Sequence, residues 1–264
     1  NFTYSRYKSI STYKPRFGNS WAEYRNSAED RWGGIWWGYQ VVGRFQNEEE
    51  IRNYPINIDG QNNRTLLPGD FIYKDVNEDG VINGMDERPI GYPDSWSPMI
   101  SYGGTIAMNW KNIDLAIDLA GATMQSWYQN YELRNPFHAG GNSPAYLLED
   151  RWHRADPYDP ESEWISGRYP AIRNGNVGPN HRNSDFWLTN VWFLRLRNIE
   201  LGYTLPKEWV SKVNVDRLRF YATASNLVSF DNVNGFEIDP EISANASVVY
   251  PQQRTIVVGL NLSL

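Results

Sequence analysis

The sequence predicts an all-β protein whose strands suit the wall of a large antiparallel transmembrane β-barrel with long extracellular loops. Three observations support this prediction. Apolar and polar residues alternate with period two over long stretches, as in strands with one apolar face. The connections between these stretches are short on one side and long on the other. Aromatic residues make up 15% of the chain, which is typical of barrel girdles and of sugar-binding surfaces.

Composition and charge exclude several other classes. The 264 residues carry a formal charge of -6, which argues against nucleic-acid binding because phosphate contacts need a basic face. The chain has no cysteine, so a disulfide scaffold, a thiolate metal site and a cysteine nucleophile are excluded. No apolar run approaches the roughly 18–20 residues of a membrane helix, so helical spanning is excluded, whereas spanning by strands is not.

The first elements in chain order are a strand and a short helix. Asn1 to Ser5 reads as a strand in progress, without an initiator Met or a signal sequence, so we expect the chain to be the tail of a longer protein. Asn47 to Tyr54 is the best helix candidate, because the acidic residues at its start suit a helix N-terminus.

A hairpin follows between Ser101 and Ala122, with a tight turn near Lys111–Asn112. One face would carry Tyr102, Gly104, Ile106, Met108, Trp110, Ile113, Leu115, Ile117 and Leu119. Trp192 to Tyr203 needs one change of phase, which predicts a β-bulge near Arg197–Asn198.

The last two alternating stretches are Arg217 to Asn226 and Thr255 to Leu264. In the first, Leu218, Phe220, Ala222 and Ala224 share a face. In the terminal stretch one face is wholly apolar and consists of Ile256, Val258, Leu260, Leu262 and Leu264.

Strand and loop lengths favour a barrel over a soluble sandwich. Ten or eleven residues at about 3.3 Å each, tilted by about 40°, cross about 27 Å, which matches the apolar band of a barrel. Sandwich strands average only about 5–6 residues, and their apolar face packs on a second sheet. The turns at Lys111–Asn112 and 206–214 are short, whereas residues 123–191 and 227–253 form long loops.

Several motifs together carry a family resemblance. They are Gly38–Ile51, Pro68–Asn83, Phe193–Pro206, Leu218–Leu227, Gly235–Glu241 and Tyr250–Thr255. In this order, and over nearly the whole chain, they resemble the SusC/RagA family of TonB-dependent outer-membrane transporters. The family's N-terminal signal, TonB box and plug would lie before Asn1, and the chain ends in Leu264 where such barrels usually end in Phe.

The resemblance implies that residues 1–264 are the C-terminal segment of a 22-stranded barrel, without its plug domain. We expect about seven strands, too few to close a barrel alone, so both edges need partners. It further implies import of oligosaccharides or peptides across the Gram-negative outer membrane, with loops at the cell surface. The implied partners are the N-terminal plug-and-barrel part, a SusD-like surface lipoprotein as lid, TonB acting through the missing plug, and outer-membrane lipid.

The strongest local motif is a calcium-loop-like insertion at residues 75–86, with oxygen donors at alternating positions and Gly80 at the turn. The predicted ligands for a structural Ca²⁺ are Asp75, Asn77, Asp79, Val81, Asn83 and Asp86. The alternative is a polar turn with side-chain-to-backbone hydrogen bonds and no metal.

Arginines at alternating positions predict a lumen-lining face, formed by Arg195, Arg197, Arg217 and Arg219, with Tyr221 beside them. These arginines could steer an anionic substrate through the lumen. Alternatively, they point inward only because an arginine facing lipid at the membrane midplane would destabilise the barrel by about 2–4 kcal/mol. The weaker substrate-binding candidates are loop aromatics, which could instead anchor the loops: Trp127, Tyr128, Trp152, Trp164 and Trp187.

No motif argues for an enzyme. The chain has 3 histidines, at 138, 153 and 181, and their spacing fits no compact metal site. The competing function is a soluble, secreted, calcium-stapled β-sandwich that binds carbohydrate. It accounts for the aromatics and the calcium loop, but not for the terminal strand's apolar face or for the strand lengths.

Overall fold

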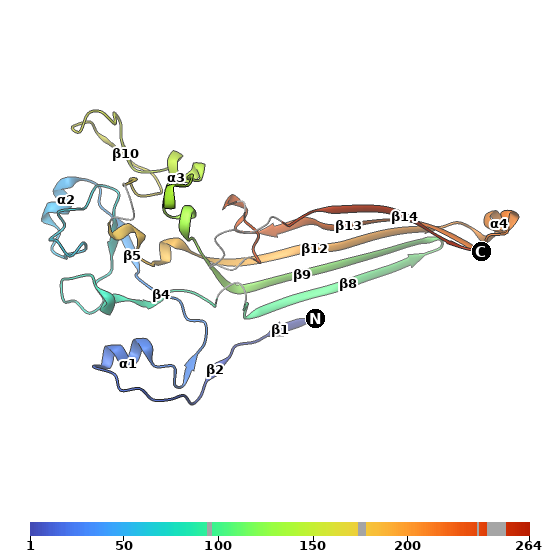
Figure 1. The fold of residues 1–264 in the computed structure, drawn as a ribbon, viewed down its shortest axis with the longest axis horizontal. Coiled ribbons are helices and arrows are strands. Elements are labelled where there is room, and N and C mark those ends of the chain that lie inside the picture. The colour runs from blue at the N-terminus through green and yellow to red at the C-terminus, as the bar shows by residue number, and fades with distance from the viewer. Residues whose placement is uncertain (94–96, 174–177, 237, 242–251) are drawn as a thin grey trace.

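A sheet of six antiparallel strands forms one end of the molecule, and long loops gather at the other (Figure 1). The computed structural model describes residues 1–93, 97–173, 178–236, 238–241 and 252–264. The sheet has the order β1-β8-β9-β12-β13-β14. Its strands are β1 (Phe2–Tyr4), β8 (Ile100–Trp110), β9 (Ile113–Tyr128), β12 (Leu188–Thr204), β13 (Arg217–Asp231) and β14 (Thr255–Ser263). The all-β prediction is confirmed, and the six strands form an open sheet that closes no barrel by itself.

The strand register confirms the predicted faces, because residues from the same predicted face pair with one another across the sheet. One row consists of Ile106, Ile117, Ile199, Ala224 and Ile256. The neighbouring row, on the opposite face, consists of Thr105, Asp118, Asn198, Ser225 and Thr255. A slip of one residue in any strand would mix the two rows, so the alternation in sequence excludes such a slip and fixes the face on which each residue lies.

Two local predictions are also confirmed. Lys111, in the two-residue turn between β8 and β9, adopts a left-handed conformation with φ of 53°. The register shifts between Leu196 and Asn198 on both sides of β12, which places the bulge at Arg197. The bulge restores the apolar residues after it to the face that Leu194 and Leu196 occupy before it.

The sheet differs from expectation in strand number and strand length. It has six strands among the described residues, against the about seven expected for a barrel segment. The short pairs upstream of β8 belong to the loops instead. Three strands extend beyond their alternating stretches: β9 continues to Tyr128, β12 begins at Leu188 and β13 ends at Asp231. The extensions of β9 and β12 enter the loop cluster, where Trp127, Tyr128 and Val191 are buried, whereas Val228 and Phe230 in the extension of β13 stay exposed.

The loops contain short elements. The α-helices are α1 (Ser20–Asn26), α2 (Glu48–Asn53), α3 (Ala145–Glu149) and, in the short turn after β12, α4 (Lys207–Val210). The paired short strands are β2 (Lys8–Ser9) with β3 (Arg31–Trp32), β4 (Trp37–Gly38) with β7 (Arg88–Pro89), β5 (Val41–Arg44) with β6 (Phe71–Tyr73), and β10 (His153–Arg154) with β11 (Trp164–Ile165). The 3₁₀ turns are η1 (Gly84–Asp86), η2 (Tyr131–Leu133), η3 (His138–Gly140), η4 (Pro179–His181), η5 (Asp185–Trp187), η6 (Ser211–Val213) and η7 (Asn234–Phe236).

The predicted helix is α2. Its N-cap is Asn47, whose side-chain oxygen accepts a hydrogen bond from Glu50 N at 2.8 Å, and it ends at the C-cap Tyr54. Its single buried residue is Ile51, which joins the hydrophobic core.

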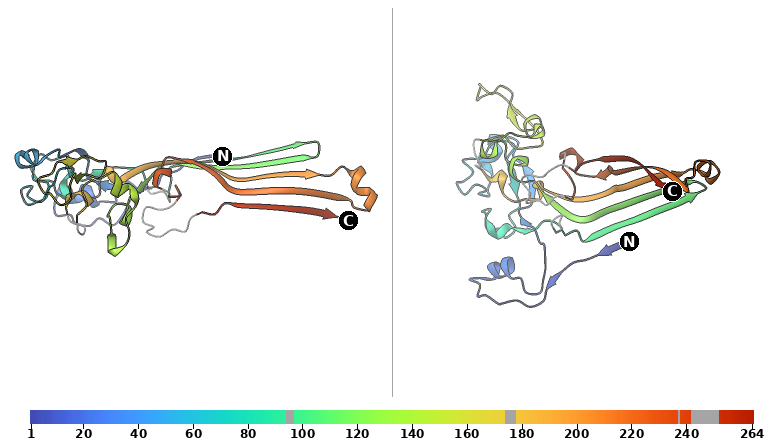
Figure 2. Two further views of the ribbon diagram at one scale, coloured as in Figure 1. Left: turned by 90° about the horizontal axis from the view of Figure 1, so that it is seen from above. Right: turned by 45° about the vertical axis from the view of Figure 1, so that its right-hand side comes forward.

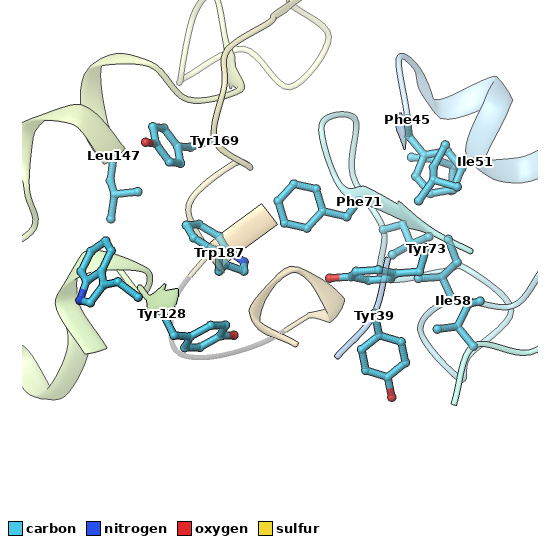
Figure 3. Packing of buried hydrophobic residues seen from close by; sticks show 14 of the residues in the cluster. Tyr39, Phe45, Ile51, Ile58, Phe71, Tyr73, Tyr128, Leu147, Tyr169 and Trp187 are labelled. Carbon is cyan, nitrogen blue, oxygen red and sulfur yellow. The ribbon is translucent and has the colours of Figure 1, made fainter. Parts of the chain in front are cut away.

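The hydrophobic core lies among the loops and includes the loop-side ends of β9 and β12 (Figure 3). Trp187 is at its centre, 1% exposed, and it stacks on Tyr169 with 6.1 Å between ring centroids. Phe71 and Tyr73 of β6 are fully buried beside it, and Leu147 of α3 closes the cluster on another side. The loop cluster is thus a packed unit with its own apolar interior.

The apolar face of the sheet is, by contrast, exposed over its whole breadth. Val258 is 78% exposed, Trp110 66% and Met108 53%. Figure 2 shows the sheet from its edge, and no second sheet of the described residues covers this face. No helix in the described part of the chain is long and apolar enough to cross a membrane.

Candidate functional site

The polar face of the sheet carries the predicted lumen residues, and three of its arginines, Arg195, Arg197 and Arg219, form ion pairs. Near the short-turn end, Arg219 on β13 donates from Nε to Asp114 Oδ1 at 3.0 Å and from Nη2 to Glu200 Oε1 at 2.6 Å. The guanidinium reaches Asp114, on the second strand away, by crossing Gly202. A Cβ at that position would lie 2.3 Å from Arg219 Nη2, so only glycine leaves room for the pair.

Tyr221 lies beside this pair. Its ring is 5.3 Å from the Arg219 guanidinium carbon and covers Gly259 of β14, where a Cβ would come within 2.5 Å of the ring. The ring therefore fills the space that a side chain on the edge strand would otherwise take.

A second charge cluster lies nearer the loops, at Arg195 and Arg197 of β12. Arg195 donates to Asp239 at 2.8 Å and to Glu241 at 2.6 Å, and Arg197 also pairs with Glu241. These arginines share a face with their acids, so the predicted cationic stripe is largely neutralised. Their placement agrees with the simpler interpretation, in which arginine avoids the apolar face.

A hollow of about 830 Å³ lies on this face. Small residues form its floor, namely Gly103, Ala120 and Ala122, while Thr105 and Asp118 line it together with Gln125 and Glu241. Thr105 donates to Asp118 at 2.7 Å. The lining of the hollow therefore contains hydroxyl, amide and carboxylate groups.

The five aromatic candidates lie in or around the loop cluster, and four of them are buried. Trp127, Tyr128, Trp152 and Trp187 are each no more than 5% exposed. Buried rings offer no free face to a ligand, so these four have the anchoring arrangement that the sequence left open as the alternative. Trp164 is half-buried under the guanidinium of Arg154, 4.6 Å from the ring centroid.

The loop at residues 75–86 is folded by its own side chains. Asp75 accepts hydrogen bonds from the backbone of Glu78 at 2.7 Å and Gly80 at 2.8 Å. Asp86, which is buried, accepts from Val76 and Asn83. The backbone of this loop also pairs with Asn57, which donates to Gly80 O at 2.8 Å and accepts from Ile82 N at 2.9 Å.

The oxygen-bearing side chains of this loop are of the kind that binds calcium, but two of them are not oriented to do so. Asp75, Asp79 and Asp86 supply carboxylates, as a hard cation requires. The side-chain nitrogens of Asn77 and Asn83, however, donate to Asp79 Oδ2 at 2.9 and 3.4 Å. Calcium binding would require both amides to turn their oxygens inward. In the described part of the chain, no group of three or more His, Cys, Asp or Glu residues is arranged to hold a metal.

Sequence reasoning missed a buried polar network at the base of the loops. Asp70 is fully buried and accepts from Leu67 N at 2.9 Å, from Asn180 Nδ2 at 2.7 Å and from Arg173. Burial raises the pKa of the Asp70 carboxyl, and the Arg173 guanidinium opposes that shift. Asn180 in turn accepts from Phe71 N at 3.0 Å and from the Trp187 indole at 2.7 Å. The only sequence signal was that Asp70 belongs to the motif beginning at Pro68.

Below the ordinary pKa of histidine we expect the loop cluster to lose stability. Burial, with the nearby charges of Arg134 and Arg173, lowers the pKa of His181 to about 4 from 6.5. The unfolded chain therefore binds a proton that the folded one refuses, so His181's contribution is complete above pH 6.5 and is lost as the pH falls toward 4. The loss is about 3 kcal/mol. Hydrogen exchange of the cluster at several pH values should show this dependence, and His181→Gln should flatten it.

Comparison with known proteins shows which proteins this chain resembles. No protein-family model matches the chain. TonB-dependent receptor P3 of Formosa agariphila is 24% identical over 245 residues, covering 87% of this chain and 22% of the relative. TonB-dependent receptor SusC of Bacteroides thetaiotaomicron is 26% identical over 197 residues, covering 74% of this chain and 18% of the relative.

Solved structures agree in fold. The RagAB peptide importer in its open-open state matches with a TM-score of 0.53 and 21% identity, covering 87% of this chain and 22% of that chain. The RagAB peptide transporter matches with a TM-score of 0.54. The chain spans about a fifth of the length of these proteins, since the shares are 18 to 22%. The resemblance seen in its motifs is thereby confirmed: over most of its length the chain is similar to a segment of SusC/RagA-like TonB-dependent receptors.

Proposed function

We propose that the complete protein imports nutrients across the Gram-negative outer membrane and that this chain is the C-terminal section of its barrel wall. The exposed apolar face of the sheet carries this proposal. Rows such as Ile106, Ile117, Ile199, Ala224 and Ile256 would face lipid, and the charged face with Arg195 and Arg219 would face the lumen.

The loops would lie at the cell surface, since long loops mark the outer rim of such barrels and short turns the inner one. The cargo would be oligosaccharides or peptides, admitted under a SusD-like lipoprotein lid. TonB would act through a plug carried by the rest of the protein. The names of the matched proteins support this set of partners, and the 21% identity to the peptide importer supports no choice of cargo. We propose no catalytic activity.

The soluble sandwich is the weaker alternative. A sandwich would cover the apolar face with a second sheet, yet Val258 and Leu260 are 78% and 58% exposed. The six strands would then expose a contiguous apolar face to water, which soluble monomers rarely do.

Affinity capture from outer membranes tests the proposal. A tag at the C-terminus of the complete protein, in mild detergent, should recover a heat-modifiable barrel that carries a plug, together with a surface lipoprotein. Recovery of the protein from the soluble fraction in plain buffer would overturn the proposal and favour the secreted carbohydrate-binding module.

We also propose that residues 75–86, as a distinct insertion within the 1–264 segment, bind one structural Ca²⁺ that pins the loop. The support is the donor pattern and the turn at Gly80, whose φ is 80°. Elemental analysis of the purified protein should find calcium, and Asp75→Ala should remove it, because Asp75 supplies the first ligand and also accepts two backbone bonds. Equal calcium content in the variant would show that the loop is only a polar turn.

A further inference from the structure

Residues 239–241, which follow β13 in the chain, lie against the polar face of the sheet. β13 has β12 and β14 as its neighbours, yet residues 239–241 contact β12 through Arg195 and β9 through Gln125. These residues therefore lie across two strands, on the face that carries the charges. We call Ile238–Glu241 the inner segment.

Arg195 is the main fastening of the inner segment. Its side chain is 5% exposed and donates to three acceptors: Asp239 at 2.8 Å, Glu241 at 2.6 Å and Gln252 at 2.9 Å. Asp239 also accepts from the backbone of Glu241 at 2.9 Å, which shapes the turn. Arg197 also pairs with Glu241, so the cluster contains two acidic and two basic side chains. Its net charge is zero, and each charged group takes part in an ion pair.

Two uncharged contacts hold the same segment. Gln125, 1% exposed, donates from Nε2 to Pro240 O at 3.1 Å. Just upstream, the Phe236 ring packs on Trp127 with 5.4 Å between centroids. The segment is thus fixed both to the sheet and to the loop cluster, unlike a loop that projects freely from the rim.

We propose that the inner segment is a built-in narrowing of the lumen and that Arg195 is the positioning residue that keeps it folded inward. The proposal rests on the proposed function in one respect, that the polar face lines the lumen. Glu241 and Gln125 border the hollow of about 830 Å³, so the edge of the inner segment lies directly against that space. Release of the segment would widen access to the hollow.

Size-selective labelling in the complete protein tests this. A Thr105→Cys reporter in the hollow, in a background without other cysteines, is treated from outside with a small maleimide and with a maleimide on a large polyethylene glycol. In the otherwise unchanged protein the small reagent should react much faster. Arg195→Met should raise the relative rate of the large reagent at least tenfold, because Asp239 loses its ion-pair partner, Glu241 keeps only Arg197, and the segment detaches.

Arg219→Met is the matched control. Arg219 is also ion-paired on the same face, but its partners are Asp114 and Glu200 and not the inner segment. It should leave the ratio unchanged, and Arg195→Lys should give an intermediate ratio because one ammonium can bond only part of the cluster. Gln125→Ala, which leaves no unpaired charge, should raise the ratio in the same direction.

Three results would overturn the narrowing: an unchanged ratio in both Arg195→Met and Gln125→Ala, an equal rise in Arg219→Met, or no labelling of the hollow by either reagent in Arg195→Met. Heat-modifiable migration on a gel shows separately that each variant forms a barrel in the outer membrane. If the unchanged protein lacks such a band, the proposed function fails as well, and the two failures remain distinguishable.

Discussion

Replacing Val258 by arginine in the complete protein is expected to reduce the folded barrel in the outer membrane more than tenfold, whereas Val257→Arg should assemble nearly normally. The two residues are neighbours of the same type on β14, with side chains on opposite faces. Val258 pairs with Ala222 in an apolar row, so an arginine there would face lipid at a cost of about 2–4 kcal/mol.

The control position has a polar environment. Val257 pairs with Thr223, whose hydroxyl lies 3.3 Å from a Glu200 carboxylate oxygen. An arginine at 257 therefore lies on the face where the chain already places its other arginines. Quantification of heat-modifiable protein in outer-membrane fractions measures both variants. Equal yields would mean that the assignment of the apolar face to lipid is wrong.

Asp70→Ala should destabilise the loop cluster by about 3–5 kcal/mol, since it leaves a buried guanidinium without its carboxylate. Arg173 keeps 13% of its side chain exposed and pairs with Asp70, which is fully buried. The same carboxylate holds Asn180, and through it Phe71 and Trp187, so β6 and the centre of the core should loosen together.

Limited proteolysis of the loops and hydrogen exchange at Phe71 would measure this loss. Asp156→Ala is the control, because Asp156 is exposed and its side chain accepts only a local turn bond from Tyr158 N at 2.9 Å. This substitution should cost about 0.5 kcal/mol or less. Replacing both partners, Asp70→Leu with Arg173→Met, should recover part of the stability. A single Asp70→Ala variant as resistant to protease as the control would show that the network does not hold the cluster.

The sheet could be predicted from sequence because the face on which a strand residue lies depends only on its position within the strand. Period-two alternation assigns each residue of a strand to one face of the sheet. The strand at Thr255–Ser263 could therefore be predicted, because every second residue in it, beginning with Ile256, is a large apolar one. The bulge at Arg197 was predictable for the same reason, since the apolar phase changes there. The helix predicted over Asn47 to Tyr54 followed from its acidic first turn, and the structure places it at Glu48–Asn53.

The loops could not be predicted in this way. The burial of Trp127 and Trp187 follows from contacts between residues far apart in the chain, and an aromatic residue in a loop has the same sequence appearance whether it meets a ligand or a core. The same holds for Asp70, whose partners Arg173 and Asn180 lie 103 and 110 residues away.

The sequence by itself determined the strand faces, the bulge, the lopsided loop lengths and, through its ordered motifs, the resemblance to SusC/RagA receptors. Only the tertiary structure decided which charges meet. Arg195 reads as one more inward arginine until residues 239–241 fold back onto it, and Arg219 reaches Asp114 only because Gly202 leaves the strand between them bare. Alternation fixes the side of the sheet on which a residue lies, whereas long-range folding fixes what it contacts there.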